Sequence, residues 1–239
     1  KEAKKGYGDE EKNYCKIEFL KKNNNYFING SQGISEGAVE SGLDICYGYP
    51  MTPATPILGE LAEKQNEKNI LVLELENEIA VINAGIGSAM TGAKTMVGTS
   101  GGGFDLMTEG LSLSGMAGVP MVIYLAQRPG PATGVPTYTG QGDLNIARHS
   151  GHGEFNRVVL APGDPKECQE LTSQAFYLSQ IFGIPSIIIS DKHLAESFYT
   201  LTEKPKITPS RKLASMARYN SYEKDKTGSA TDEPEIINK

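Results

Sequence analysis

The chain has 239 residues and a formal net charge of −6, and its charged side chains gather toward its two ends. Residues 31–200 carry only 18 acidic and 8 basic side chains, together with 23 of the 27 glycines. This acidic balance argues against a nucleic-acid partner, and no run of about 18 apolar residues exists that could span a membrane. Cys15, Cys46 and Cys168 form no CxxC pair, so the usual zinc and iron–sulfur spacings are absent and we expect the reducing cytoplasm.

One domain between two polar arms is the organisation that this distribution predicts. We expect a charged lead-in over residues 1–26, a glycine-rich domain over 27–200, and a charged linker over 201–239 that leads toward a missing domain. The length agrees with one domain plus extensions, since domains average about 150 residues. The first residue is not Met, so we expect a processed or cut fragment.

Short apolar runs alternate with helical patterns along the middle of the chain. The runs are rich in Val and Ile and are bounded by Gly, Pro or Asp, which is typical of buried strands. We predict strands at 43–47, 70–75, 94–99, 121–126, 157–160 and 186–190, and helices at 35–41, 56–67, 78–91, 104–117 and 165–182. Such repeats pair strands in parallel through right-handed crossovers, so we predict an α/β fold with three αβα layers around a mostly parallel sheet.

The first strand is followed by the sequence GYPMTPATP, residues 48–56, before the next helix begins. Its three prolines fix φ and push the residue before each of them toward extended geometry. The result is a stiff loop that presents the hydroxyls of Thr52 and Thr55. Thr55 is explained as a helix N-cap with Pro56 at the first helical position. Thr52 has no such explanation, so a ligand role and a structural role both stay open.

Glu78 lies just after the strand 70–75 and opens a helix. Acidic side chains are common at helix N-termini, where the helix dipole favours them, so position alone does not assign a role. The helix that follows has small or apolar residues on nearly every face, which predicts a helix buried all round. We therefore expect Glu78 at the mouth of a buried layer, where a carboxylate needs a partner.

The run TSGGGF at residues 99–104 joins a strand to a helix. Its three glycines permit positive φ or a close approach of the backbone to a neighbour. Two interpretations stay open, namely a tight strand–helix turn and a ligand or partner subunit that presses against the turn.

Arg128 follows the strand 121–126 on a loop stiffened by Pro129 and Pro131, far in sequence from other Lys or Arg side chains. A lone guanidinium in this place suits bidentate capture of a carboxylate. A structural ion pair with Glu78 or Asp105 is the alternative.

The connection 127–156 shows no clear element, although it is rich in Gly, Pro and Thr. Loops of this length are usually functional, and this one starts at the carboxyl end of a strand, where α/β sheets collect ligands. His149, His152 and Glu154 lie on it, but no further ligand set accompanies them. We therefore expect surface or partner contacts at the histidines and no metal.

Together these segments resemble the alpha subunit of the 2-oxoacid:ferredoxin oxidoreductase family over about residues 27–225. The matching motifs are GYPMTPAT at 48–55, ENEIA at 76–80, TSGGGF at 99–104, QRPGPATGVPT at 127–137, QGDL at 141–144 and GHGE at 151–154. Met51, Ala54 and Gly102 depart from the usual family residues. None of the three replaces a reactive group.

The resemblance implies a pyrimidine-binding domain for thiamine diphosphate. Glu78 matches the glutamate that hydrogen-bonds the aminopyrimidine ring of the cofactor, and Pro50 matches a cofactor-side contact. Thr52 and Arg128 match the residues that hold the oxo and carboxylate oxygens of a 2-oxoacid substrate. The implied catalytic residues are therefore Glu78, Arg128 and Thr52, with Thr52 also on the cofactor side.

The family also implies partner chains. A beta subunit would contribute the pyrophosphate-binding domain, Mg²⁺ and a 4Fe–4S cluster, and gamma and ferredoxin-like subunits would complete a hetero-oligomer. The implied enzyme is inactive without these partners. With them it decarboxylates a 2-oxoacid oxidatively to an acyl-coenzyme A and reduces ferredoxin, and the QRPGP segment favours 2-oxoglutarate.

Two other functions are compatible with parts of this sequence. One is a non-catalytic binding or assembly module of such a complex. The other is an unrelated nucleotide-binding protein, which is disfavoured because GSAMTGAK at 87–94 has an extra residue before its lysine and lies at a helix end.

Overall fold

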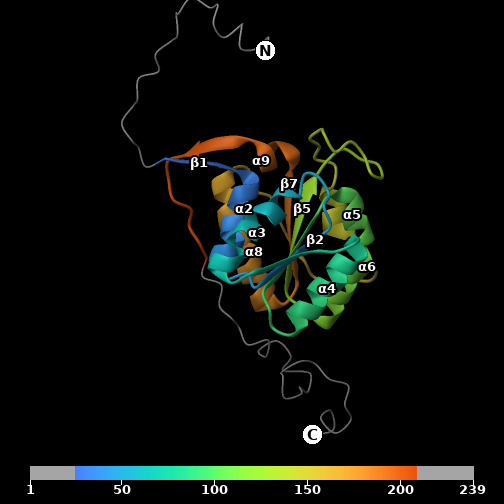
Figure 1. Cartoon of the computed structure of the whole chain (residues 1–239). Coiled ribbons are helices and arrows are strands. Elements are labelled where there is room, and N and C mark those ends of the chain that lie inside the picture. The colour runs from blue at the N-terminus through green and yellow to red at the C-terminus, as the bar shows by residue number, and fades with distance from the viewer. Residues whose placement is uncertain (1–24, 209–239) are drawn as a thin grey trace, which may run out of the picture.

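The computed structural model describes residues 25–208, which form a central parallel sheet covered by helices on both faces (Figure 1). The six strands, in order across the sheet, are β3 (Leu71–Glu74), β2 (Ile45–Gly48), β4 (Thr95–Thr99), β5 (Met121–Gln127), β7 (Pro185–Asp191) and β6 (Val158–Leu160). Every neighbouring pair in this sheet is parallel. Of the predicted arms 1–26 and 201–239, residues 1–24 and 209–239 lie outside the described residues.

Helices cover both faces of the sheet (Figure 1). The first face carries α2 (Gly30–Glu40), α3 (Pro56–Lys68) and α8 (Pro165–Phe182), and the second carries α4 (Glu78–Met90), α5 (Gly101–Leu106) and α6 (Thr108–Ala117).

The pleat of β5 explains why both faces are apolar. Val122 and Tyr124 point into the core beneath α2, α3 and α8, whereas Ile123 and Leu125 point into the opposite core. A strand buried on both faces reads as one continuous apolar run, which is the pattern on which the prediction rested. The predicted α/β fold with three layers and a mostly parallel sheet is confirmed.

Two predicted helices have different bounds in the structure. Helix α2 begins five residues earlier than expected, because Asn29 and Gln32 form a reciprocal capping box with bonds of 2.8 and 3.1 Å. The single helix predicted at 104–117 is divided at Met107 into α5 and α6. Three glycines in α2 and three in α5 lower the helix propensity of those segments, so the sequence pattern did not reveal where either helix begins.

Four short elements were not predicted: α7 (Leu144–His149) inside the long connection, α9 (Lys192–Glu196), and the strands β1 (Tyr26–Asn29) and β8 (Phe198–Leu201). The strands β1 and β8 pair with each other in an antiparallel ribbon, and their Phe27 and Phe198 rings stack with centroids 5.0 Å apart. Each element is four to six residues long, so it carries too little periodicity to be predicted from the sequence and depends on tertiary contacts.

The prediction that α4 is buried all round is wrong. Val81 and Ile86 are buried against the sheet, but Ile79 and Met90 are 52% and 50% exposed on the outer side of the helix. Leu71 on the edge strand β3 is also half exposed. Because α4 lies in the outer layer, no described element covers its outer side, where Asn83 and Gly87 lie exposed between Ile79 and Met90.

No helix within residues 25–208 is long and apolar enough to cross a membrane. The described cysteines, Cys46 and Cys168, are unpaired and lie in the core. Burial raises the pKa of the Cys46 thiol to about 12, and burial likewise raises the pKa of Cys168. Both thiols therefore act as small apolar side chains.

Candidate functional site

The predicted site residues gather at the carboxyl edge of the sheet. The strands β2, β4 and β5 are neighbours, so the loops that follow them lie together. Pro50 and Thr52 follow β2, Arg128 follows β5, and Glu78 opens α4 shortly after β3. Two contacts link these loops: Arg128 binds the loop of Thr52, and Glu78 packs against the glycine turn after β4.

Glu78 is a buried carboxylate at the first position of α4, with 3% of its surface exposed. The helix is capped by Asn77, whose side chain accepts a hydrogen bond from the backbone nitrogen of Ala80 at 2.9 Å. The Oε1 atom of Glu78 is buried and has no hydrogen-bond partner among the described residues. Burying a carboxylate oxygen without a hydrogen-bond partner costs free energy, so this atom suits a partner from outside the described residues.

The three glycines after β4 admit close neighbours from this chain itself. A Cβ atom at Gly101 would lie 2.6 Å from Oδ2 of Asp143, and one at Gly102 would lie 3.0 Å from the carbonyl oxygen of Ala132. A Cβ at Gly103 would overlap the carboxylate of Glu78. None of the three has positive φ, so close approach is the reason for the glycines.

The loop after β2 becomes helical at Thr55, where the prolines predict extended geometry. Thr55 has helical φ and ψ of −52° and −39°, and its side chain makes no cap hydrogen bond. The predicted extended geometry and hydroxyl cap of Thr55 are therefore wrong, although Pro56 opens the helix as expected. Backbone bonds replace the cap, including that of Leu58 nitrogen to Thr55 oxygen at 3.0 Å. Pro50 and Thr52 are exposed at this edge.

Arg128 is 7% exposed and joins two loops. Its guanidinium donates to the carbonyl oxygen of Thr52 at 2.8 Å and to that of Thr133 at 2.5 Å. Neither Glu78 nor Asp105 forms the ion pair that was the structural alternative. The Nε atom is buried without a partner among the described residues. The positive charge is thus fixed in place but not neutralised by a carboxylate of the described chain.

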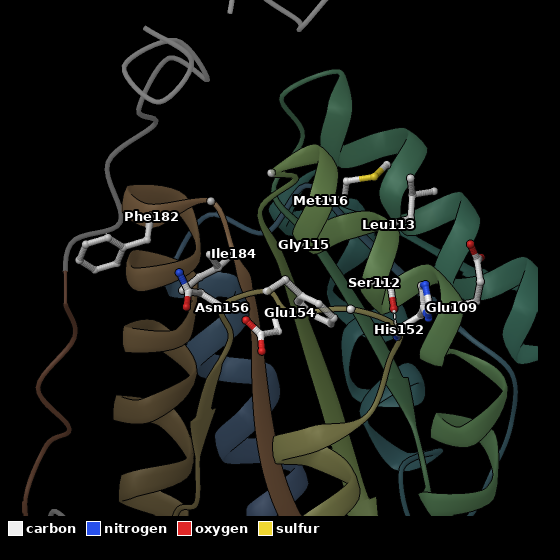
Figure 2. A pocket seen from close by; sticks show the side chains of 14 residues that line it. Glu109, Ser112, Leu113, Gly115, Met116, His152, Glu154, Asn156, Phe182 and Ile184 are labelled. Carbon is white, nitrogen blue, oxygen red and sulfur yellow. Dashed lines mark hydrogen bonds between the residues drawn. The ribbon is translucent and has the colours of Figure 1, made fainter. Parts of the chain in front are cut away.

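The two histidines of the long connection line other surfaces. His152 borders a groove of about 760 Å³ between α6 and the end of α8, where Met116 and Phe182 stand on opposite sides (Figure 2). Its backbone nitrogen donates to the hydroxyl of Ser112 at 2.7 Å. His149 borders an adjoining polar recess. Across residues 25–208 no three His, Cys, Asp or Glu side chains come together to hold a metal.

The sequence motifs at 99–104 and 141–144 contain Thr99 and Asp143, but they assigned no role to these two neighbours of the site. Both pack against the glycine turn, Thr99 at Gly103 and Asp143 at Gly101. The available signal was the glycine run itself, because consecutive glycines mark places where other groups approach the backbone. It could not say which groups these are.

The family model for pyruvate flavodoxin/ferredoxin oxidoreductase, thiamine diphosphate-binding, matches residues 36–238 of this chain. The chain belongs to this family. Among its relatives, the 2-oxoglutarate synthase subunit KorA of Archaeoglobus fulgidus is 40% identical over 173 residues, which are 71% of this chain and 50% of that protein. The 2-oxoacid:ferredoxin oxidoreductase 1, subunit alpha, of Sulfurisphaera tokodaii is 36% identical over 197 residues, covering 76% of this chain and 31% of that one.

A solved structure extends the likeness to three dimensions. It is the 2-oxoglutarate:ferredoxin oxidoreductase from Magnetococcus marinus with 2-oxoglutarate, coenzyme A and succinyl-CoA bound, at 28% identity and a TM-score of 0.75. The match covers 90% of this chain and 42% of that chain. The chain therefore spans half or less of the length of these oxidoreductase-family proteins.

Replacing Gly103 with alanine should destabilise the fold, because the added methyl group overlaps the carboxylate of Glu78 and the hydroxyl of Thr99. We expect a loss of about 1–3 kcal/mol in the free energy of unfolding, measured by urea denaturation. Gly87→Ala is the matched control, since nothing lies within 4 Å of its added carbon on α4. It should be neutral or stabilise by up to about 1 kcal/mol. Equal stabilities for the two variants would contradict the packing described for Gly103.

Proposed function

We propose that this domain is the pyrimidine-binding half of a thiamine diphosphate site in a 2-oxoacid:ferredoxin oxidoreductase. The complete enzyme would decarboxylate a 2-oxoacid oxidatively, transfer the acyl group to coenzyme A and reduce ferredoxin. The observation that carries the proposal is the buried, unpartnered Oε1 of Glu78 at the carboxyl edge of the sheet. In a family whose description includes thiamine diphosphate binding, that oxygen, when it carries a proton, would donate a hydrogen bond to a ring nitrogen of the cofactor's aminopyrimidine.

The residues at this edge suit the cofactor in chemical type. Glu78 would donate a hydrogen bond to a ring nitrogen of the pyrimidine and so share its proton with that atom. Pro50 and Thr52, exposed on the loop after β2, would contact the cofactor from the other side. When bound, thiamine diphosphate supplies the electron sink for decarboxylation.

The substrate would be held by Arg128 and Thr52. A planar guanidinium binds carboxylates through two parallel hydrogen bonds, and the charge of Arg128 is not neutralised by a described carboxylate. The exposed hydroxyl of Thr52 would donate to the oxo oxygen. We favour 2-oxoglutarate as the substrate, because relatives are named 2-oxoglutarate synthase and the solved relative carries 2-oxoglutarate.

Partner subunits would complete the enzyme. A beta subunit would bring the pyrophosphate-binding domain with Mg²⁺ and a 4Fe–4S cluster, and gamma and ferredoxin-like subunits would link it to ferredoxin. The relatives named as subunits support such an assembly. The cytoplasm stays a prediction.

Glu78→Gln should lower turnover by at least about 100-fold in the assembled complex, because the amide keeps the shape of the side chain but cannot hold and release a proton. Coenzyme-A-dependent reduction of viologen with 2-oxoglutarate measures it. Glu76→Gln, at an exposed acid just before the same helix, should leave the rate unchanged. Wild-type turnover in the Glu78 variant would show that the proton role is wrong. A wild-type complex without turnover would instead favour a binding or assembly module.

Arg128→Lys should raise KM about tenfold or more for every 2-oxoacid of a panel, because a point charge cannot replace the guanidinium fork. Arg148→Lys, at an exposed position on α7, provides the control and should keep the wild-type KM. An unchanged KM in the Arg128 variant would remove this residue from substrate binding.

A further inference from the structure

A single buried glutamine closes the base of the long loop that carries Arg128. Gln127 is the last residue of β5 and is 6% exposed. Its Oε1 accepts a hydrogen bond from the backbone nitrogen of Asp143 at 2.9 Å, and its Nε2 donates to the carbonyl oxygen of Ser190 at 3.1 Å. One side chain therefore joins the start of the loop, residue 128, to its end at residue 143 and anchors both to β7.

The closed loop packs on itself around Pro129. The backbone nitrogen of Val135 donates to the carbonyl oxygen of Pro129 at 2.9 Å. A Cβ atom at Gly140 would lie 2.9 Å from the nitrogen of Pro129, so the end of the loop packs closely against its beginning. This packing places the carbonyl oxygen of Thr133 on the guanidinium of Arg128 at 2.5 Å. The position of Arg128 thus depends on the closure of the loop.

Asp143 connects the closed loop to the glycine turn beside Glu78. The carboxylate of Asp143 lies against Gly101, the first residue of the glycine turn, and Gly103 of that turn packs on Glu78. Burial, and next the charge of Asp105, raise the pKa of Asp143, as expected for a carboxylate pressed against this turn.

Both polar ends of Gln127 are already bonded within the chain. Its oxygen holds Asp143 and its nitrogen holds Ser190. A second glutamine, Gln141, donates to Asp191 at 2.5 Å from the same end of the loop, but Gln141 is exposed whereas Gln127 is buried. When a buried hydrogen bond is lost, its partner is left unsatisfied. Removing the hydrogen bonds of Gln127 should therefore cost more free energy than removing that of Gln141.

We propose that Gln127 is a positioning residue for the substrate-binding arginine: it closes the loop 128–143 and so fixes the guanidinium of Arg128 without touching the substrate. This inference rests on the proposed function, in which Arg128 binds the carboxylate shared by all 2-oxoacids. A loop that opens at its base loses the carbonyl of Thr133 as a fixed acceptor, and the guanidinium turns away from the carboxylate.

The test replaces Gln127 with methionine, which keeps the length of the side chain and removes both hydrogen bonds, in the chain assembled with its partner subunits. We expect KM to rise about tenfold for every 2-oxoacid, with kcat reduced less than about threefold, because binding is lost more than proton transfer. KM for coenzyme A should not change.

Gln169→Met is the matched control. Gln169 is 7% exposed on α8 and has one side-chain bond, to Glu40 at 2.7 Å, so its loss tests the general effect of removing a buried amide. It should leave KM for 2-oxoacids unchanged. A wild-type KM in the Gln127→Met complex, or an equal rise in the Gln169→Met complex, would overturn the inference.

Hydrogen exchange separates this inference from the proposed function. In Gln127→Met without substrate, amides over 129–143 should exchange at least about tenfold faster than in the wild type, while those of α3 keep their rates. Unchanged protection over 129–143 would mean that Gln127 does not close the loop, whatever the enzyme does. An inactive wild-type complex would overturn the proposed function, and the exchange rates alone would then decide whether Gln127 closes the loop.

Discussion

The buried carboxylate of Glu78 is the constraint around which the carboxyl edge of this sheet is arranged. One of its oxygens has no donor within the described residues, although an orphaned carboxylate oxygen in a core is unfavourable. The surrounding fold restricts the position of this carboxylate, because Thr99 at the end of β4 and Gly103 in α5 lie close to it. A fold that holds an unsatisfied group this firmly is typical of a site that a ligand completes.

The two charged groups of the site are kept apart rather than paired. Arg128 is fixed by the carbonyl oxygens of Thr52 and Thr133, and Glu78 is fixed by the turn that follows β4. Backbone carbonyls orient a guanidinium without cancelling its charge, so the arginine can still attract a carboxylate. An ion pair between Arg128 and Glu78 would have satisfied both groups and left neither for a ligand.

The sequence predicted those parts of the molecule that depend on long, continuous patterns. The six strands were found because a strand buried on both faces is an unbroken apolar run, and the loops after them placed Pro50, Thr52, Glu78 and Arg128 at one edge. The short elements, the exposed outer side of α4 and the tie of Gln127 to Asp143 were not predicted. Each depends on which neighbour lies opposite in space, which no periodicity records, and Gln127 and Asp143 are 16 residues apart.

Thiamine diphosphate binding tests the central claim that this domain is half of a shared site. Calorimetric titration of the cofactor with Mg²⁺ should be made into this chain, into its partner subunit, and into the mixture. We expect the mixture to bind at least about tenfold more tightly than either chain alone, and Glu78→Ala to remove that gain. A mixture that binds the cofactor no more tightly than the partner subunit alone would contradict the account.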